Sequence, residues 1–206
     1  MATAAVSPNR MELLRMKKKQ QFAQRGHKLL KDKLEGLLKD FTGIVQGYAV
    51  LRDQVDSELG ELFQQFIVAS ASMPAEVYRS ALAFPECEAE LTMTEKLIMN
   101  VRVPEFSFAI EGNLLSYGTD GTVVELDQAI VKLGEVLERL VKLAEAEKTI
   151  ELVADEIEKT RRRVNALEYV LIPQQAETIR MISSKLEELE RGNITRLMRI
   201  KQLLAM

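Results

Sequence analysis

The sequence predicts a mainly α protein: a long antiparallel two-helix coiled coil formed by the N- and C-terminal helices, with a small α/β insertion at one end. Three observations support this fold class. Apolar residues recur every three and four positions near both chain ends, the 206 residues include only five prolines and ten glycines, and only 5% of residues are aromatic. Few helix breakers, together with abundant Leu, Glu, Lys and Arg, favour long helices over a compact sheet.

We expect the first coiled-coil helix in residues 1–73. A heptad spacing runs through it without a miss between Leu30 and Val55. A repeat sustained over this length is typical of a left-handed coiled coil. The positions of this first seam are Leu13, Met16, Gln20, Ala23, His27, Leu30, Leu34, Leu37, Phe41, Ile44, Tyr48, Leu51, Val55, Glu58 and Leu62.

The ends of this helix also have sequence signals. Ser7 is the expected N-cap, and Pro8 then falls in the first turn, where proline is tolerated. Pro74 disfavours helical geometry at the residue before it, so we expect the helix to stop there.

Residues 74–124 have a different character and predict a small globular insertion. The stretch "MPAEVYRSALAFPECEAELTMTEKL" is expected to hold one or two short helices. The following stretch, "NVRVPEFSFAIEGNLLSYGTDGTVVEL", alternates apolar and polar residues and contains Pro104 and several glycines. It predicts a short β element of the hairpin type, with Pro104 favouring an edge position.

We expect the second coiled-coil helix in residues 125–206. Its seam slips in phase near Glu147, and Pro173 predicts a kink because proline removes one helix hydrogen bond. The seam positions are Ile130, Leu133, Leu137, Leu140 and Ala144, then Ile150, Val153, Ile157, Thr160, Val164, Leu167 and Leu171, and finally Ile179, Ile182, Leu186, Leu189, Ile200 and Leu203.

Charge is distributed unevenly along the chain. Residues 1–40 hold ten Lys and Arg against four Asp and Glu, and residues 185–206 hold five against three, although the net charge is −3. Both ends are therefore basic and the middle is acidic. Because the second helix is the longer one, we expect its basic C-terminus to project past the first helix.

The sequence offers no candidate for catalysis, for a metal or for a cofactor. His27 is the only histidine and lies on the first seam, so we expect a packed residue. Cys87 has no partner for a disulfide or a zinc site, and a reducing compartment follows as the default. No apolar run is long enough to span a bilayer, so we expect no direct membrane insertion.

The triplet Arg161, Arg162 and Arg163 lies between two seam positions, Thr160 and Val164. Successive residues of a helix are about 100° apart, so the three side chains fan over roughly 200° of its surface. They form either a solvated face or a surface that a partner surrounds on several sides. Nucleic-acid binding is the weaker interpretation, because the cations form no single stripe and aromatic residues are not interleaved with them.

Two stretches, "RGHKLLKDKLEGLLKDF" (25–41) and "TRRRVNALEYVLIP" (160–173), resemble the D subunit of V/A-type rotary ATPases and ATP synthases. The N-terminal "SPNRMELLRMKKKQQFAQ" and the C-terminal "TIRMISSKLEELERGNITRLMRIK" are similar to the same family. The resemblance implies a non-catalytic central stalk, or rotor shaft. Such a protein transmits torque between the ring that hydrolyses or synthesises ATP and the ion-translocating membrane rotor.

The resemblance also implies partners. These are the nucleotide-binding A and B subunits of the ring, the small F subunit of the stalk and a membrane-rotor adaptor, with no nucleic acid. The protein would be cytoplasmic and peripheral to the membrane. The expected ring interface is Arg161, Arg162, Arg163, Arg25 and Lys28. The expected surface for the small partner is Val101, Val103, Phe106 and Phe108, interpreted as an exposed strand edge. The alternative is a structural or tethering coiled coil with no rotary role.

Overall fold

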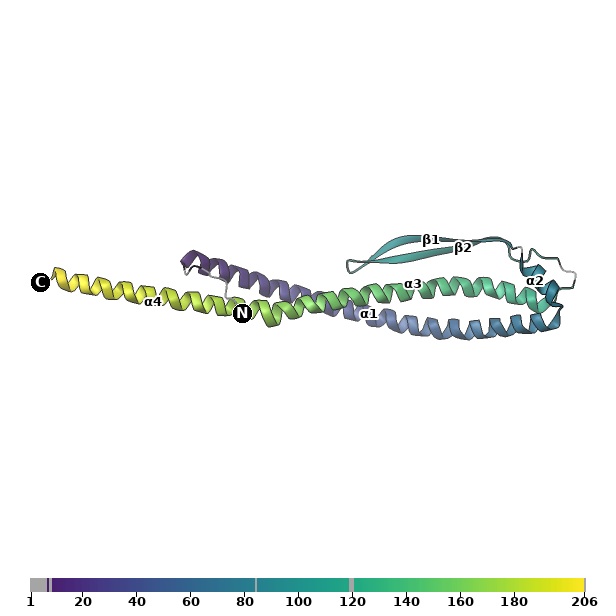
Figure 1. Cartoon of the computed structure of the whole chain (residues 1–206), viewed down its shortest axis with the longest axis horizontal. Helices are drawn as coiled ribbons and strands as arrows, with labels where there is room; N and C mark the ends of the chain where they lie inside the picture. Colours follow the sequence, from purple (N-terminus) through teal and green to yellow (C-terminus); the bar gives the residue numbers. More distant parts are fainter. Residues whose placement is uncertain (1–6, 8, 84, 119–120, 206) are drawn as a thin grey trace. The chain divides into compact units, whose positions relative to one another are not determined.

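The computed structural model of the chain describes residue 7 and residues 9–83, 85–118 and 121–205 (Figure 1). A long helix precedes a two-stranded sheet, and a second long helical run follows it, so the predicted mainly α fold class is confirmed. The elements are α1 (Arg10–Ser72), α2 (Ala75–Ala83), β1 (Glu86–Ile98), β2 (Val101–Asn113), α3 (Val124–Ala166), the π-helix η1 (Leu167–Leu171) and α4 (Ile172–Leu204).

The chain forms two compact units, which we describe separately. The end unit joins the first part of the chain, up to Gly36, with the part from Ile157 onward. The hairpin unit comprises Leu37–Glu156 and contains the two-stranded sheet.

The start of α1 differs from the prediction. The side-chain oxygen Oδ1 of Asn9 accepts hydrogen bonds from the backbone N–H groups of Met11, at 2.7 Å, and Glu12, at 3.2 Å. Asn9 is thus the N-cap, satisfying two of the donors that a helix start leaves unpaired. The predicted cap, Ser7, lies two residues too early, and Pro8 is outside the described residues.

The first seam is covered along its whole predicted length. Every position from Leu13 to Leu62 is at least partly buried, and Leu37, Val55 and Leu62 are fully so. In the hairpin unit, the buried residues of α3 are Leu126, Ala129, Ile130, Val136, Thr149 and Val153. The helices therefore pair through one apolar stripe each, as the heptad spacing predicts.

The second seam departs from the prediction before Glu147. Ala144, a predicted seam residue, is exposed, whereas Leu143 and Ala146 are partly covered and Thr149 is buried. Leu143, Ala146 and Thr149 follow one another at steps of three residues, and three residues make less than one full helical turn. The covered stripe therefore moves around the helix axis along this stretch. The change of phase is real, but it begins earlier than the sequence indicated.

Before Pro173, the second helical run contains the π-helical turn η1. The backbone N–H of Ile172 bonds to the carbonyl of Leu167, five residues earlier, and α4 then continues with proline in its first turn. Proline cannot donate a hydrogen bond to the preceding turn, and one wider turn is a known way to accommodate such a break. The kink at Pro173 stays a prediction, and the sequence did not specify the π-helix.

The insertion contains one short helix and one hairpin, and its first strand was missed. Residues 86–98, expected to be helical, form β1 and pair with β2 in continuous antiparallel register from Glu86↔Asn113 to Ile98↔Val101. Met99 and Asn100 connect the strands with positive φ angles of 45° and 68°. Such angles at both loop residues define the type I′ turn that suits strand twist. Thr119 and Asp120, which belong to the stretch predicted to form the β element, lie outside the described residues.

The base of the insertion packs on a small core. Ala69, Met73, Leu126 and Ile130 are buried there, with Tyr117 packed against them. The Tyr117 hydroxyl donates a 2.5 Å hydrogen bond to Oδ1 of Asp127. Burial and this bond raise the pKa of Tyr117. The protonated Tyr117 side chain therefore stabilises the folded chain. This contribution is fully present below the usual tyrosine pKa of about 10, and it is lost as the pH rises through the higher pKa of the folded state.

Leu37 and its neighbour Leu38 provide a matched test of the seam. Leu37 is 0% exposed and Leu38 is 45% exposed. Leu37→Ala should lower the free energy of unfolding by about 2–5 kcal/mol, because it removes buried methyl groups and leaves a cavity. Leu38→Ala should cost less than about 1 kcal/mol. Urea unfolding followed by circular dichroism measures both, and equal losses would contradict the predicted seam.

Candidate functional site

The arginine triplet lies on the outside of the end unit. Thr160 and Val164 are buried, whereas Arg161, Arg162 and Arg163 between them are exposed. Arg162 forms an ion pair with Glu158, one turn earlier on the same helix. An exposed pair of this kind adds little to stability, so we expect the triplet to contribute little to the fold of the end unit.

His27 of α1 lies beside Glu168 of η1. Nε2 of His27 lies 3.4 Å from Oε2 of Glu168, in a geometry that does not complete a hydrogen bond. His27 is partly buried, in agreement with its seam position, while Arg25 and Lys28 on either side of it are exposed. Residues 25–28 of α1 therefore lie near Glu168, within the stretch 160–173 that carries the arginine triplet.

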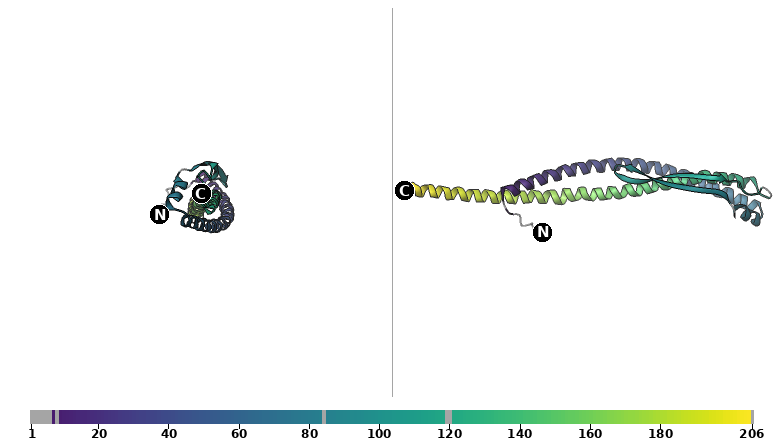
Figure 2. Two further views of the ribbon diagram at one scale, coloured as in Figure 1. Left: turned by 90° about the vertical axis from the view of Figure 1, so that its right-hand side faces the viewer. Right: turned by 90° about the horizontal axis from the view of Figure 1, so that it is seen from above.

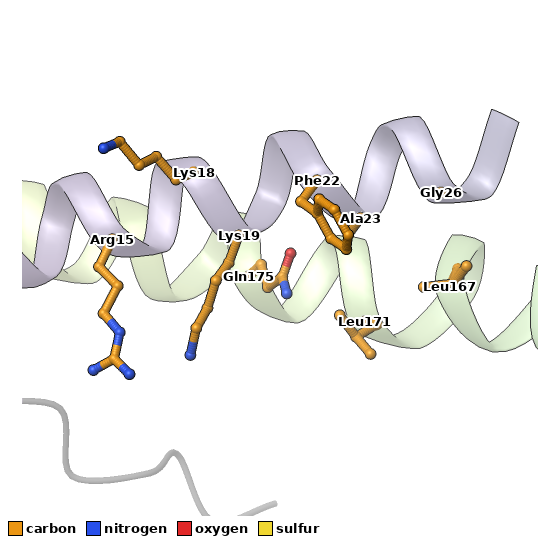
Figure 3. A pocket seen from close by; sticks show the side chains of 9 residues that line it. All are labelled: Arg15, Lys18, Lys19, Phe22, Ala23, Gly26, Leu167, Leu171 and Gln175. Carbon is orange, nitrogen blue, oxygen red and sulfur yellow. The ribbon is translucent and has the colours of Figure 1, made fainter. Parts of the chain in front are cut away.

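A groove opens between α1 and the η1–α4 segment of the end unit (Figure 3). Its volume is about 630 Å³. The floor is apolar or small, and cationic side chains stand along its α1 side. The lining residues are Arg15, Lys18, Lys19, Phe22, Ala23, Gly26, Leu167, Leu171 and Gln175.

The last part of α4 is unsupported by any other described element. Arg10 of α1 pairs with Glu190, and every described residue from 191 to 205 is exposed. This segment contains four cations and no acidic residue. Its exposed apolar side chains are Ile194, Leu197, Met198, Ile200, Leu203 and Leu204. A basic helix with this much exposed apolar surface is typical of a segment that a partner covers.

The four residues expected to form an exposed strand edge are placed differently. Val101 and Val103 are buried, and Phe106 and Phe108 are half-buried. The expectation of exposure was wrong for both valines, because the strand packs against its own chain. β2 runs alongside α3 (Figures 1 and 2). The backbone N–H of Phe106 donates a 2.9 Å hydrogen bond to Oε2 of Glu145 on α3.

This contact fixes the direction of the remaining backbone groups of β2. Because the N–H of Phe106 points away from β1, every second residue of β2 shares that direction, and Pro104 is one of them. Proline at position 104 lacks an N–H group that would have pointed away from β1. No hydrogen bond between the two strands is lost as a result. The outer edge of β2 is therefore occupied by α3, and the edge of β1 is the open one.

The open strand exposes large apolar side chains. Leu91 is 55% exposed, Met93 65% and Leu97 68%. The antiparallel register alternates side-chain faces, so these three residues share one face of the hairpin with Phe106 and Phe108. Sequence reasoning missed this set because β1 was expected to be helical. The alternation of Leu91, Met93 and Leu97 with Thr92 and Thr94 was the available signal.

Neither a metal site nor a membrane span is found among the described residues. No group of three or more His, Cys, Asp or Glu side chains among them is arranged to hold a metal ion. No helix in the same part of the chain is sufficiently long and apolar to cross a membrane.

The chain is similar in sequence to known proteins over nearly its whole length. A profile of the ATP synthase D subunit matches residues 12–202. The D subunit of V-type ATP synthase in Acetivibrio thermocellus is 49% identical, over 99% of this chain and 94% of that protein. The proteins of the same name in Fusobacterium nucleatum and Clostridium novyi are each 47% identical, over 99% of this chain and 98% and 97% of theirs. The chain belongs to the family of the ATP synthase D subunit.

The Phe106–Glu145 bond yields a local prediction. Glu145→Ala should speed hydrogen exchange at the Phe106 amide by about tenfold, because the amide loses a charged acceptor that closes the edge of β2. Glu147→Ala, two residues along α3, is the control and should leave that amide unchanged. Hydrogen exchange followed by NMR resolves the single site, and an unaltered rate in Glu145→Ala would show that α3 does not hold the hairpin edge.

Proposed function

We propose that this chain is the central stalk of a V/A-type ATP synthase or ATPase, and that it transmits torque between the nucleotide-binding ring and the ion-translocating membrane rotor. Family membership makes it a component of such a complex. The observation that carries the role of a shaft is the surface of the end unit, where exposed cations and exposed large apolar side chains face several directions around one helix pair.

A surface of this kind favours a partner that surrounds the helices. Exposed apolar residues occur on α1, on η1 and on α4. They are Met11, Leu14, Phe22, Leu29, Tyr169, Val170, Leu171, Leu189 and the six residues at the end of α4. Single exposed apolar residues are normal, but a dense set around both helices marks an interaction surface. A flat partner reaches only one side, whereas a ring of subunits reaches all of them.

The A and B subunits of the ring are the proposed partners of the end unit. Arg161, Arg162, Arg163, Arg25 and Lys28 are exposed and contribute outward positive charge. Charges at such an interface set orientation and encounter more than they set affinity. ATP binding and hydrolysis are assigned to the ring, so this chain acts as a non-catalytic component. A cytoplasmic location, peripheral to the membrane, follows from the same assignment.

The small F subunit of the stalk is the proposed partner of the hairpin unit, and a membrane-rotor adaptor is proposed to complete the stalk. Because Val101 and Val103 are buried, we move the contact to the open side of the hairpin, at Leu91, Met93 and Leu97. The β1 edge offers unpaired backbone groups beside these side chains, a combination that suits strand addition or apolar docking. Phe106 and Phe108 would extend the same apolar face on β2.

Replacing Arg161, Arg162 and Arg163 together by Ala tests the shaft role. The variant should remain folded, because none of the three faces the seam, but its ATP-driven ion pumping should fall relative to its ATP hydrolysis. Reconstituted complexes measure both rates. The matched control, in which all three become Lys, keeps the charge and should pump nearly normally. Normal assembly and coupling in the Ala variant would leave the triplet as a solvated face.

Leu91→Ser, Met93→Ser and Leu97→Ser in one chain test the hairpin. Binding of the small stalk partner should weaken by at least about tenfold, because about 1.4 kcal/mol of lost apolar contact suffices for that change. Thr92→Ala with Thr94→Ala, on the opposite face, is the control. Calorimetric titration measures both variants, and undiminished affinity in the Ser variant would remove the hairpin face from the interface.

The tethering alternative is separated by assembly. Mixing the purified chain with the ring proteins on a sizing column should give one complex that contains both. A chain that elutes alone, or only with itself, would favour the tethering interpretation.

A further inference from the structure

We propose that the groove of the end unit is a docking site for an acidic and apolar segment of the nucleotide-binding ring. An aliphatic side chain of that segment enters between Phe22 and Leu171, and neighbouring carboxylates pair with Arg15 and Lys19. This inference rests on the proposed function, because the ring supplies the occupant, and it assigns one contact that family membership does not specify.

The groove exists because two small residues face a wide helical turn. Ala23 and Gly26 lie on the α1 side, and Leu167 and Leu171 are the first and last residues of η1. A Cβ atom built on Gly26 would have no neighbour within 4 Å, so the space above it is open. Larger residues at these two positions would fill the space from within the chain, and the sequence does not provide them.

The apolar side chains around the groove are left incompletely packed. Leu171 occupies a predicted seam position but is 41% exposed, and Phe22 is 80% exposed. Figure 3 shows the Phe22 ring beside Ala23 on the α1 side of the groove, with Leu171 on the opposite helix. Burying such side chains favours association by roughly 25 cal/mol for each Å² of apolar surface. The described chain has no element that covers them, so the apolar contact is available to a partner.

The charge around the groove selects the partner. Arg15 and Lys19 are one helical turn apart, and Figure 3 shows both projecting from α1 to the same side of the groove. Arg15 has one exposed ion pair, with Glu12 at 3.6 Å, which a stronger carboxylate partner can replace. Residues 10–26 contain six cationic side chains and only one acidic residue, Glu12.

This balance favours an acidic segment over a second copy of the chain. Two copies of the groove would bring the same cations together, and like charges across an interface are unfavourable. An aliphatic residue flanked by Asp or Glu satisfies the apolar floor and the cationic side at once. The groove is therefore best matched to a loop or helix end with that composition.

Filling the groove from within separates docking from folding. Gly26→Leu places a side chain in open space and replaces a poor helix former with a good one, so its melting temperature should equal or exceed that of the unchanged chain. The same change should weaken binding to the purified ring by at least about tenfold. Gly43→Leu is the matched control, since Gly43 is an exposed residue of α1 with equally open space, and it should bind normally.

A second variant tests the charge. Arg15→Glu with Lys19→Glu should weaken binding to the ring by at least about tenfold at low salt, and the difference from the unchanged chain should shrink as salt screens the groove. The measurement is surface-based kinetics of the full chain on the assembled ring. Sedimentation of each chain alone reports whether the occupant is a second copy.

Each outcome has a separate meaning. Weaker binding in both groove variants, with normal binding by Gly43→Leu, supports the docking site. Ring binding that Gly26→Leu leaves unchanged overturns the docking site while the central stalk role stands. No binding of the unchanged chain to the ring overturns both. A dimer of the unchanged chain that Gly26→Leu dissociates would assign the groove to a second copy and overturn the acidic occupant.

Discussion

Each unit depends on one constraint: a long helix must bury its apolar stripe against only one other helix. A seam of this kind covers a narrow strip, because a heptad brings two positions in seven toward the partner. Leu37, Val55, Leu62 and Val153 lie fully within that strip. In the end unit, most described residues on the remaining faces are exposed, so they can contact other proteins without disturbing the fold. The same chain can therefore combine a stable helix pair with a surface of exposed cations and apolar side chains.

The hairpin follows a different rule, since a two-stranded sheet has two edges and little core of its own. The β2 edge is closed by α3, where Glu145 accepts the N–H of Phe106, and Pro104 removes another donor from that edge. The β1 edge stays open beside Leu91, Met93 and Leu97. Exposed strand edges favour unwanted pairing, and a partner that covers this edge would remove that liability.

The long helices could be predicted from the sequence because their signal is repeated many times. The heptad positions between Leu30 and Val55 reinforce one another, so a single unusual residue such as Tyr48 does not obscure them. The exposure of the arginine triplet follows from its place between two seam residues. The hairpin was harder to predict. Glu90 and Glu95 favour helix locally, whereas the strand depends on pairing with residues up to Asn113, which no local pattern contains. The groove could not be predicted from the sequence, because it depends both on the π-turn of η1 and on the position of α1 that brings His27 beside Glu168.

The uncovered end of α4 has implications for the chain before it is assembled. A helical segment of about fifteen residues without tertiary support is marginally stable in water, so it frays and exposes its backbone. Arg191, Arg196, Arg199 and Lys201 make this segment a series of cleavage sites for proteases that cut after basic residues. A protein that surrounded this helix would shield the same sites. Copies of the chain without such a partner would then be open to cleavage at this end, and incorporated copies would be protected.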